Sequence, residues 1–496
     1  MRTRRDQVQA YRFVTRRIVS ALLSGDPETN DLPMRRLGMA VFGSVIAAAV
    51  VLGGAGAYGQ FTGNAAPLEP NTLVIERETG ATYVFTDDGL LHPTLNYASA
   101  RLILNEADPS VRTMSRASIK DRPRGRTAGI VGAPGALPDP KSLVGLPWSV
   151  CDVPDPVDPQ RSTIRLVIDR PLPGGTPLTD QAVLVRVDGS RYLLTGGAQL
   201  RVVGDEQALV ALKMAGAPTL TVGQQLLNAV PVGPALRKPN IDGYGGSSGV
   251  AVADRPARIG QVYRAAGQYY VLTRQGLVAV TEMTALLLLG DGGQVTDITP
   301  SQAGELLTDQ RLDAEGLPQK LPALHEVRAG RTVLCASYRS AGPGQPPTTT
   351  LEVFDQPPAE LTAATGVATR QTARDAVRTA ESVLLPGGKG VLVQAAAGDT
   401  GKAAAGSTVY LITAQGVRYP LGTASGDARA ALGYGGVTPL AVPASLLALV
   451  PTGPALERQD AMSYFDPGAR PRTTAADKPD QPDSATSSGS SAAPGG

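Results

Sequence analysis

The sequence predicts an α+β protein in which a single membrane anchor carries an elongated outer region built from repeats. Three observations favour this fold class: one uncharged apolar run near the N-terminus, four copies of a tyrosine-containing pattern, and two cysteines placed between the copies. A chain of 496 residues is long enough for several domains. The 57 glycines and 41 prolines favour turns and short elements, and a net charge of +2 gives no reason to expect a nucleic-acid partner.

The first 36 residues are predicted to lie in the cytoplasm and to contain an amphipathic helix that ends near Gly25 and Pro27. Apolar residues recur in this helix at spacings of three and four, which places them on one side. We call this set the N-terminal apolar face; it consists of Val8, Tyr11, Val14, Ile18 and Leu22. Arginines occupy other positions, so the pattern fits a helix lying on anionic lipid and fits equally a helix docked on a cytosolic partner.

Residues 37–59 are predicted to cross the membrane as one helix. They contain no charged residue, and a bilayer requires about 20 apolar residues. Eight arginines precede residue 37, whereas the first basic residue after the span is Arg77. This asymmetry predicts a cytoplasmic N-terminus and places the bulk of the chain outside the cytoplasmic membrane. A cleaved signal peptide is the alternative, but the segment before the apolar run is too long for one.

Four copies of one pattern follow, each with a tyrosine, two apolar residues, a threonine and, three positions later, a glycine or alanine. The copies begin at Tyr83, Tyr192, Tyr270 and Tyr410. The pattern is typical of a strand that ends in a turn, and three copies follow an apolar run with a glycine turn, which predicts a β-hairpin. Ala198 replaces the glycine in the second copy, so Gly196 or Gly197 is expected to make that turn.

A short helix is predicted after each hairpin, so the expected unit is a hairpin plus a small helix. The helix signal is clearest in copies two and four, whose tails read LLNAVPVGPAL and LLALVPTGPAL. Copies one and three carry weaker tails, SRASIKDRPRG and ITPSQAGELL. Matching hairpins and matching tails indicate a true repeat, and repeats usually build shape and surface.

Cys151 and Cys335 are predicted to form a disulfide, because both lie outside the membrane, where the environment is oxidising. Each cysteine lies in one of the two longest intervals between copies. We therefore expect a β-rich central domain built from residues 126–180 and 318–402, with two repeats inserted between these segments and the disulfide clamping them together. Trp148 is expected to pack against the disulfide.

These expectations divide the chain into nine parts. They are the cytoplasmic helix (1–36), the transmembrane helix (37–59), repeat 1 (60–125), the first part of the central domain (126–180), repeat 2 (181–240), repeat 3 (241–317), the second part of the central domain (318–402), repeat 4 (403–465) and a tail (466–496). The tail is rich in Pro, Ser, Gly, Ala and Asp and is predicted to be disordered, because it cannot bury enough apolar surface to fold.

No catalytic, cofactor or metal site is predicted. A phosphate-binding loop requires glycines at fixed spacing followed by lysine and a hydroxyl residue; the nearest stretch, AAGDTGKA around Lys402, lacks the first glycine and the hydroxyl. His92 and His325 are expected to be packing or surface residues, which leaves no base for a nucleophilic triad. Two histidines and two cysteines are also too few for most zinc sites. The protein is therefore expected not to be an enzyme.

The stretch RRDQVQAYRFVTRRIVSALLSGDPE, followed by one span, closely resembles the N-terminus of the EccB family. The resemblance covers nearly the whole chain, including four repeats around a central domain with two cysteines. It implies a membrane-anchored core component of the actinobacterial type VII (ESX) secretion system. It also implies self-association and partners of three kinds: an EccC-like ATPase and the EccD-like and EccE-like membrane components, which together export WXG100-type proteins.

The expected function is therefore structural, in the assembly of a secretion complex. One alternative is a protein that binds the cell wall, because the repeat of this family has been likened to peptidoglycan-binding modules of phage lysins. Another is an extracytoplasmic ATP hydrolase, since some family members have been described as ATPases. The absent phosphate-binding loop disfavours the hydrolase.

Overall fold

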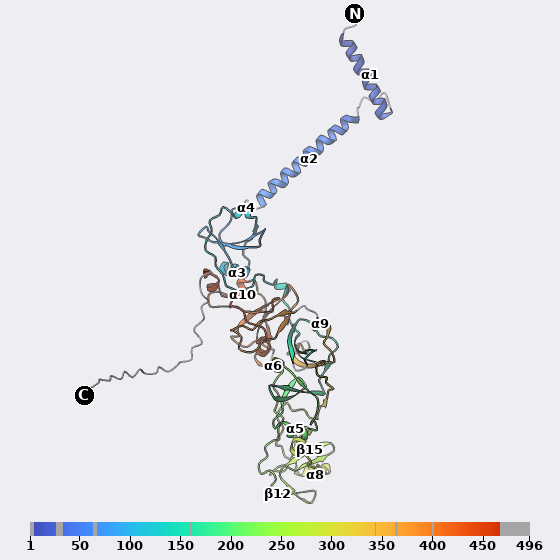
Figure 1. Ribbon diagram of the computed structural model, residues 1–496, viewed down its shortest axis with the longest axis vertical. Helices are drawn as coiled ribbons and strands as arrows, with labels where there is room; N and C mark the ends of the chain where they lie inside the picture. Colours follow the sequence, from blue (N-terminus) through green and yellow to red (C-terminus); the bar gives the residue numbers. More distant parts are fainter. Residues whose placement is uncertain are drawn as a thin grey trace, which may run out of the picture.

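The structure is a computed structural model that describes residues 4–25, 33–62 and 67–466, apart from 156, 159–160, 343, 363–365 and 399–400. Two N-terminal helices lead into a long stack of small β-rich units (Figure 1). The predicted disordered tail lies outside the described residues except for Asp466, so its disorder stays a prediction.

Two long helices precede the stack. Helix α1 (Arg4–Ser24) ends where Gly25 adopts a positive φ of 70° and donates its N–H to Ala21 O, as expected for a helix C-terminus. Helix α2 (Pro33–Thr62) contains the apolar window Leu37–Tyr58, which has a mean hydropathy of 2.1 and no part buried within the chain. Among the described helices it is the one long and apolar enough to span a bilayer, in agreement with the span expected at 37–59.

Each repeat folds as a four-stranded sheet with helices. Strands one to three form an antiparallel meander, a helix follows, strand four returns parallel to strand one, and a second helix closes the unit. Repeat 1 contains β1 (Thr72–Glu76), β2 (Thr82–Phe85), β3 (Leu91–Pro93), α3 (Tyr97–Leu104), β4 (Val111–Met114) and α4 (Arg116–Ile119). Repeat 2 contains β8 (Gln181–Val187), β9 (Ser190–Thr195), β10 (Ala198–Arg201), α5 (Asp205–Ala211), β11 (Thr219–Thr221) and α6 (Gln224–Ala229).

The other two repeats have the same order of elements. Repeat 3 contains β14 (Val262–Ala265), β15 (Gln268–Leu272), β16 (Leu277–Val280), α7 (Glu282–Leu289), β17 (Thr296–Asp297) and α8 (Pro300–Leu306), preceded by the separate hairpin β12 (Ser247–Val252) and β13 (Arg255–Arg258). Repeat 4 contains β23 (Gly390–Ala395), β24 (Val409–Thr413), β25 (Arg418–Pro420), α10 (Ala428–Ala431), β26 (Leu440–Val442) and α11 (Ala444–Leu447), followed by α12 (Arg458–Ala461).

The expected hairpins and short helices are confirmed, but the unit is larger than a hairpin plus one helix. The turn after the second strand uses positive φ at Gly89, Gly276 and Gly416, and in repeat 2 both Gly196 and Gly197 adopt positive φ. The third and fourth strands were not expected, because they are only two to four residues long and carry little pattern of their own.

The expected start of repeat 4 at residue 403 is wrong. Strand β23 pairs antiparallel with β24, so the sheet of repeat 4 begins at Gly390 and the boundary falls inside the loop that joins the two strands. Strand β23 ends at Ala395 and β24 begins at Val409, whereas the other three repeats join their first two strands by shorter connections. A long loop gives no local signal that the two strands pair.

The central domain is a seven-stranded sheet of order β21-β22-β6-β5-β19-β20-β7. Its strands are β5 (Trp148–Pro154), β6 (Ser162–Ile168), β7 (Thr176–Pro177), β19 (Val333–Arg339), β20 (Thr348–Phe354), β21 (Val367–Ala368) and β22 (Ser382–Leu384). Both expected segments therefore contribute, although the short β18 (Ala323–Leu324) pairs with β8 of repeat 2. The remaining short helices are Pro140–Ser142 and α9 (Ala359–Thr362).

Cys151 of β5 and Cys335 of β19 form the predicted disulfide, with their Cα atoms 4.1 Å apart on neighbouring strands. Trp148 does not pack against it. Trp148 lies three positions before Cys151 on the same strand, and successive side chains of a strand point to opposite faces. Trp148 therefore joins the core on the other face, beside Val150.

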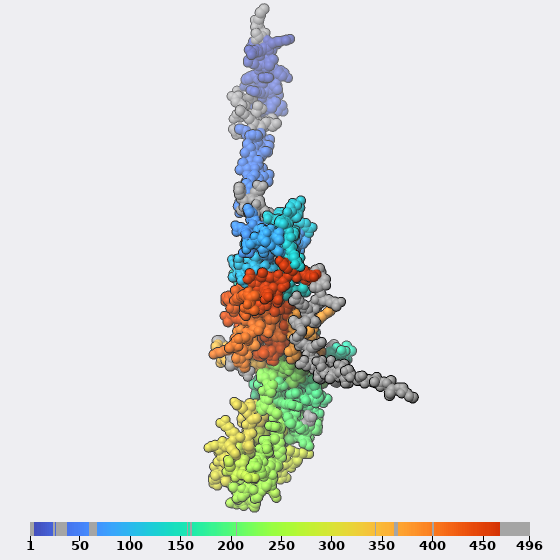
Figure 2. Space-filling model, turned by 90° about the vertical axis from the view of Figure 1, so that its left-hand side faces the viewer, coloured from blue at the N-terminus to red at the C-terminus, as the bar shows by residue number. Residues whose placement is uncertain are grey.

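From the N-terminal helices onward, the colours of Figure 2 follow the order repeat 1 (blue), repeat 4 (red and orange), repeat 2 (green) and repeat 3 (yellow-green). Repeat 1 contacts repeat 4 through α3, α10 and α12, and repeat 2 contacts repeat 3 through α5 and α7. In the middle, α6 and α11 contact each other, and their apolar residues share one core with the central sheet. We call repeats 2 and 4 the inner repeats and repeats 1 and 3 the outer repeats.

Candidate docking and assembly surfaces

The N-terminal apolar face is exposed along the whole of α1. The exposed fractions are 53% for Val8, 75% for Tyr11, 53% for Val14, 53% for Ile18 and 80% for Leu22. Beside this face, Tyr11, Thr15 and Val19 line a shallow hollow of about 350 Å³ together with Arg12 and Arg16. Apolar surface of this extent on a helix in contact with water is typical of an interaction site.

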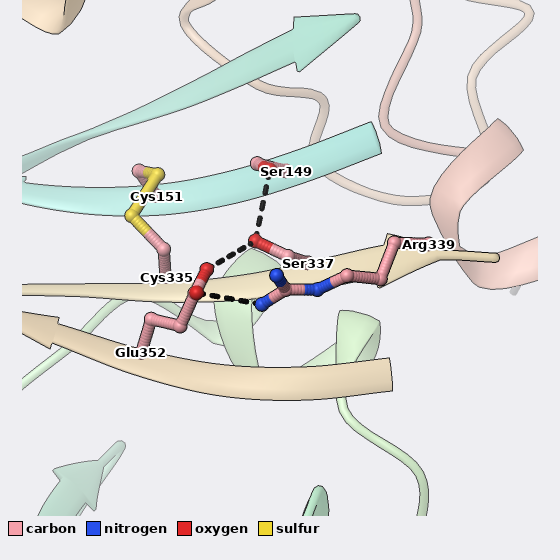
Figure 3. The surroundings of a disulfide bond; sticks show 6 residues. All are labelled: Ser149, Cys151, Cys335, Ser337, Arg339 and Glu352. Atoms are coloured by element: carbon pink, nitrogen blue, oxygen red, sulfur yellow. Dashed lines mark hydrogen bonds and ion pairs between the residues drawn. A yellow bond between two sulfur atoms is a disulfide. The ribbon is translucent and has the colours of Figure 1, made fainter. Parts of the chain in front are cut away.

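A polar network runs beside the disulfide and joins three strands of the central sheet (Figure 3). The hydroxyl oxygens of Ser149 and Ser337 are 2.9 Å apart, and Ser337 donates to the Glu352 carboxylate at 3.1 Å. Arg339 completes the network through an ion pair of 2.6 Å with the same carboxylate. Covalent and polar contacts therefore hold β5, β19 and β20 together, and both cysteines are completely buried, which is the environment of a structural disulfide.

The four signature tyrosines occupy the same position in their repeats. Each lies in the second strand, opposite a residue of the first strand: Tyr83 faces Val74, Tyr192 faces Val185, Tyr270 faces Tyr263 and Tyr410 faces Val393. All four belong to hydrophobic cores or pack against them. Their shared role in the structure is to pack the repeat, as aromatic residues in strands usually do.

The described residues around Lys402 do not have the form of a phosphate-binding loop. Lys402 lies in the loop between β23 and β24, where its carbonyl accepts the N–H of Ala397 at 2.8 Å. A phosphate-binding loop leads from a strand into a helix, whose N-terminal amides bind phosphate. The element after Lys402 is a strand, so these amides are absent from this place.

The two histidines make local contacts. His92 lies 2.9 Å from the Asp88 carboxylate at the turn of repeat 1, and the Thr86 hydroxyl followed by His92 lowers the pKa of Asp88 to about 2. His325 contacts the side chain of Gln181 at 2.8 Å. Within the described ranges, no group of three or more His, Cys, Asp or Glu residues could hold a metal ion.

One buried acid, Asp152, was missed by the sequence reasoning. Asp152 lies in β5 with only 3% of its surface exposed, and burial raises its pKa to about 6, against hydrogen bonds from Gly223 and Ser162. The proline-rich stretch after it is typical of a loop. The signal that could have revealed it is the apolar run SVCDV, in which an acid two positions from Val150 shares that residue's buried face.

An anchored chain with one span, an exposed helical face before the span and a stack of repeats beyond it defines a membrane-bound assembly protein. Residues 1–468 match the family described as "Type VII secretion system ESX-1, transport TM domain B". The chain belongs to this family, the EccB proteins, which are components of the membrane complexes of type VII secretion systems.

Individual relatives support the same conclusion. The chain is 31% identical to "ESX-3 secretion system ATPase EccB3" of Mycolicibacterium smegmatis, over 93% of this chain and 90% of that protein. It is 29% identical to "ESX-5 secretion system ATPase EccB5" of Mycobacterium tuberculosis, over 93% of both chains.

Two solved structures are similar along most of their length. A chain of an intact ESX-5 inner membrane complex matches with a TM-score of 0.66 and 27% identity, over 94% of this chain and 96% of that one. A chain of the EccB3 dimer from the ESX-3 core complex matches with a TM-score of 0.64 and 28% identity, over 79% of this chain and all of that one.

Proposed function

We propose that this chain is a non-enzymatic assembly component: α1 docks on cytosolic or membrane subunits of a type VII secretion complex, and the stacked repeats contact further subunits outside the membrane. The observation that carries the proposal is the exposed N-terminal apolar face, because most apolar residues of the repeats are buried in hydrophobic cores. The EccC-like, EccD-like and EccE-like proteins and a second copy of the chain are the proposed partners, and peptidoglycan contact stays a prediction.

In the proposed membrane topology, the N-terminus lies in the cytoplasm. It rests on the eight arginines that precede residue 37, since positive charge is retained on the cytoplasmic side. The central disulfide agrees with it, because such bonds persist in oxidising compartments.

Absence of ATP hydrolysis is part of the proposal, although relatives carry the word ATPase in their names. Two features support it. The sequence around Lys402 lacks the first glycine and the hydroxyl of a phosphate-binding loop, and the loop leads into a strand rather than a helix.

Paired substitutions on α1 test the docking proposal. Tyr11→Leu with Val14→Leu keeps the face apolar but changes its shape, whereas Tyr11→Ala with Val14→Ala shrinks it. Docking on a protein requires a particular shape, so both pairs should lower secretion and reduce the fraction of chain in the large complex on native gels, with unchanged membrane levels.

Two results would contradict docking on a protein. If the leucine pair behaves like the unaltered chain, the face requires only apolar character and lies on lipid. If deletion of residues 2–30 leaves export and complex size unchanged, α1 has no assembly role. Gln9→Ala, on the opposite side of α1 by helical spacing, is the matched control and should have no effect.

A further inference from the structure

The junction between the central domain and repeat 2 contains a buried carboxylate. Asp152 lies on the face of the central sheet that packs against the inner repeats, and it is 3% exposed. Its Oδ2 accepts the N–H of Gly223 at 2.7 Å and the hydroxyl of Ser162 at 3.1 Å. Gly223 is the N-cap of α6, so one carboxylate of the central sheet holds the start of the second helix of repeat 2.

A second carboxylate holds the same helix from the segment that precedes β22. Glu381 accepts the N–H of Ile164 at 2.8 Å and lies 3.4 Å from the side-chain nitrogen of Gln225 in the first turn of α6. Gln225 is itself buried, with 3% exposure. Two acids from separate elements thus converge on one helix start and repel each other when both are ionised.

Charged residues lie on two of the segments beside Asp152, the segment before β22 and the loop before β19. Glu381 faces it and carries an ion pair of 3.1 Å with Arg378. The loop on the opposite side contains Arg328, which pairs with Glu326 at 3.5 Å, and Arg331. Burial is the main cause that raises the pKa of Asp152 to about 6, the hydrogen bonds from Gly223 and Ser162 oppose it, and repulsion by Glu381 adds to it.

Protons can reach Asp152. A small cavity of about 50 Å³ is lined by Asp152, Pro154, Thr221 and Gly330 among others, between the end of β5, the strand before α6 and the loop before β19. This volume is enough for a water molecule, and the carboxylate supplies a polar partner for it.

We propose that the Asp152–Glu381 pair makes the attachment of repeats 2 and 3 to the central domain depend on pH, with the junction tighter in acid. When Asp152 is protonated, its carbonyl oxygen still accepts the N–H of Gly223, while the repulsion from Glu381 and the cost of burying a charge disappear. The proposed topology places Asp152 outside the membrane, so the pH on that side would control the junction. The pH response itself does not depend on the topology.

The sign follows from proton linkage. The closed junction binds the Asp152 proton more tightly than an opened junction with an ordinary carboxyl pKa of 3.8, so lowering the pH favours the closed state. The stabilisation is complete below about pH 4 and is lost as the pH rises through about 6. Between pH 7 and pH 5, the equilibrium constant for opening should fall about tenfold.

Hydrogen exchange of the full-length protein in detergent micelles tests this inference. Peptides covering residues 219–230 should gain about tenfold in protection between pH 7 and pH 5, after correction for the intrinsic exchange rate. Asp152→Asn should abolish the gain, because asparagine can accept from Gly223 but does not titrate. Asp309→Asn, at an exposed position, is the control and should retain the full gain.

Glu381→Gln provides a second test that leaves Asp152 in place. Removal of the repulsion should keep the gain in protection but move it to lower pH. The inference is overturned if protection of this segment in the unaltered protein is constant or falls between pH 7 and pH 5. It is overturned equally if Asp152→Asn folds and responds to pH like the unaltered protein, or if Glu381→Gln leaves the midpoint of the response unchanged.

Discussion

The inner and outer repeats share one unit but use its last helix differently. In the inner repeats this helix buries large residues in the core of the central domain: Leu226 and Leu227 of α6, and Leu446 and Leu447 of α11. In the outer repeats the helix lies at the ends of the stack and buries one residue each, Ile119 of α4 and Ala303 of α8. The sequence similarity between the tails of repeats 2 and 4 therefore reflects a shared packing surface, because only the inner tails pack against the same sheet.

Removal of the disulfide is expected to show the largest difference between the inner and the outer repeats. Cys151→Ser with Cys335→Ser should cost the central domain up to about 5 kcal/mol in the chain-entropy model, since the bond closes a loop of 184 positions. Hydrogen exchange should rise in the central strands and in the inner tails that pack on them, and much less in the sheets of repeats 1 and 3. A uniform rise across all four repeats would show that outer and inner repeats unfold as one unit.

Truncation of one buried side chain in each class sharpens the comparison. Leu447→Ala and Ile119→Ala each remove a nearly fully buried side chain and should each cost about 3 kcal/mol. The two substitutions should destabilise different parts of the molecule. Leu447→Ala should destabilise the central sheet and repeat 2 as well as repeat 4, because these elements share one core. Ile119→Ala should destabilise repeat 1 alone. Limited proteolysis with mass mapping measures how far each effect extends, and equal spread would contradict the distinction.

The smallest effect is expected at Lys402, in the long loop of an inner repeat. Lys402→Ala changes an exposed side chain, so its effect on stability should lie within about 0.5 kcal/mol. Any phosphate release by purified protein should also be unchanged, because no phosphate-binding loop surrounds this residue. ATP hydrolysis that follows the protein through several columns and disappears on this substitution would refute the non-enzymatic proposal.

Local pattern was sufficient for elements that form from neighbouring residues. The span of α2 follows from an uncharged apolar run, and the end of α1 follows from Gly25. The strand that contains each signature tyrosine follows from its β-branched and aromatic residues and the turn glycine after it. The pairing of Cys151 with Cys335 could be predicted because the chain has two cysteines and both lie outside the membrane, in an oxidising environment.

Only the tertiary structure decided which distant segments meet. The pairing of β23 with β24 crosses a long loop whose turn glycines do not specify which strands pair, so the boundary at 403 was misplaced. Trp148 faces away from the disulfide because strand alternation, not closeness in sequence, sets the direction of a side chain. The surroundings of Asp152 are formed by segments distant in sequence, among them Gly223 at the start of α6 and the loop before β19. Such contacts are stabilised by burial summed over the whole core, which no short stretch of sequence specifies.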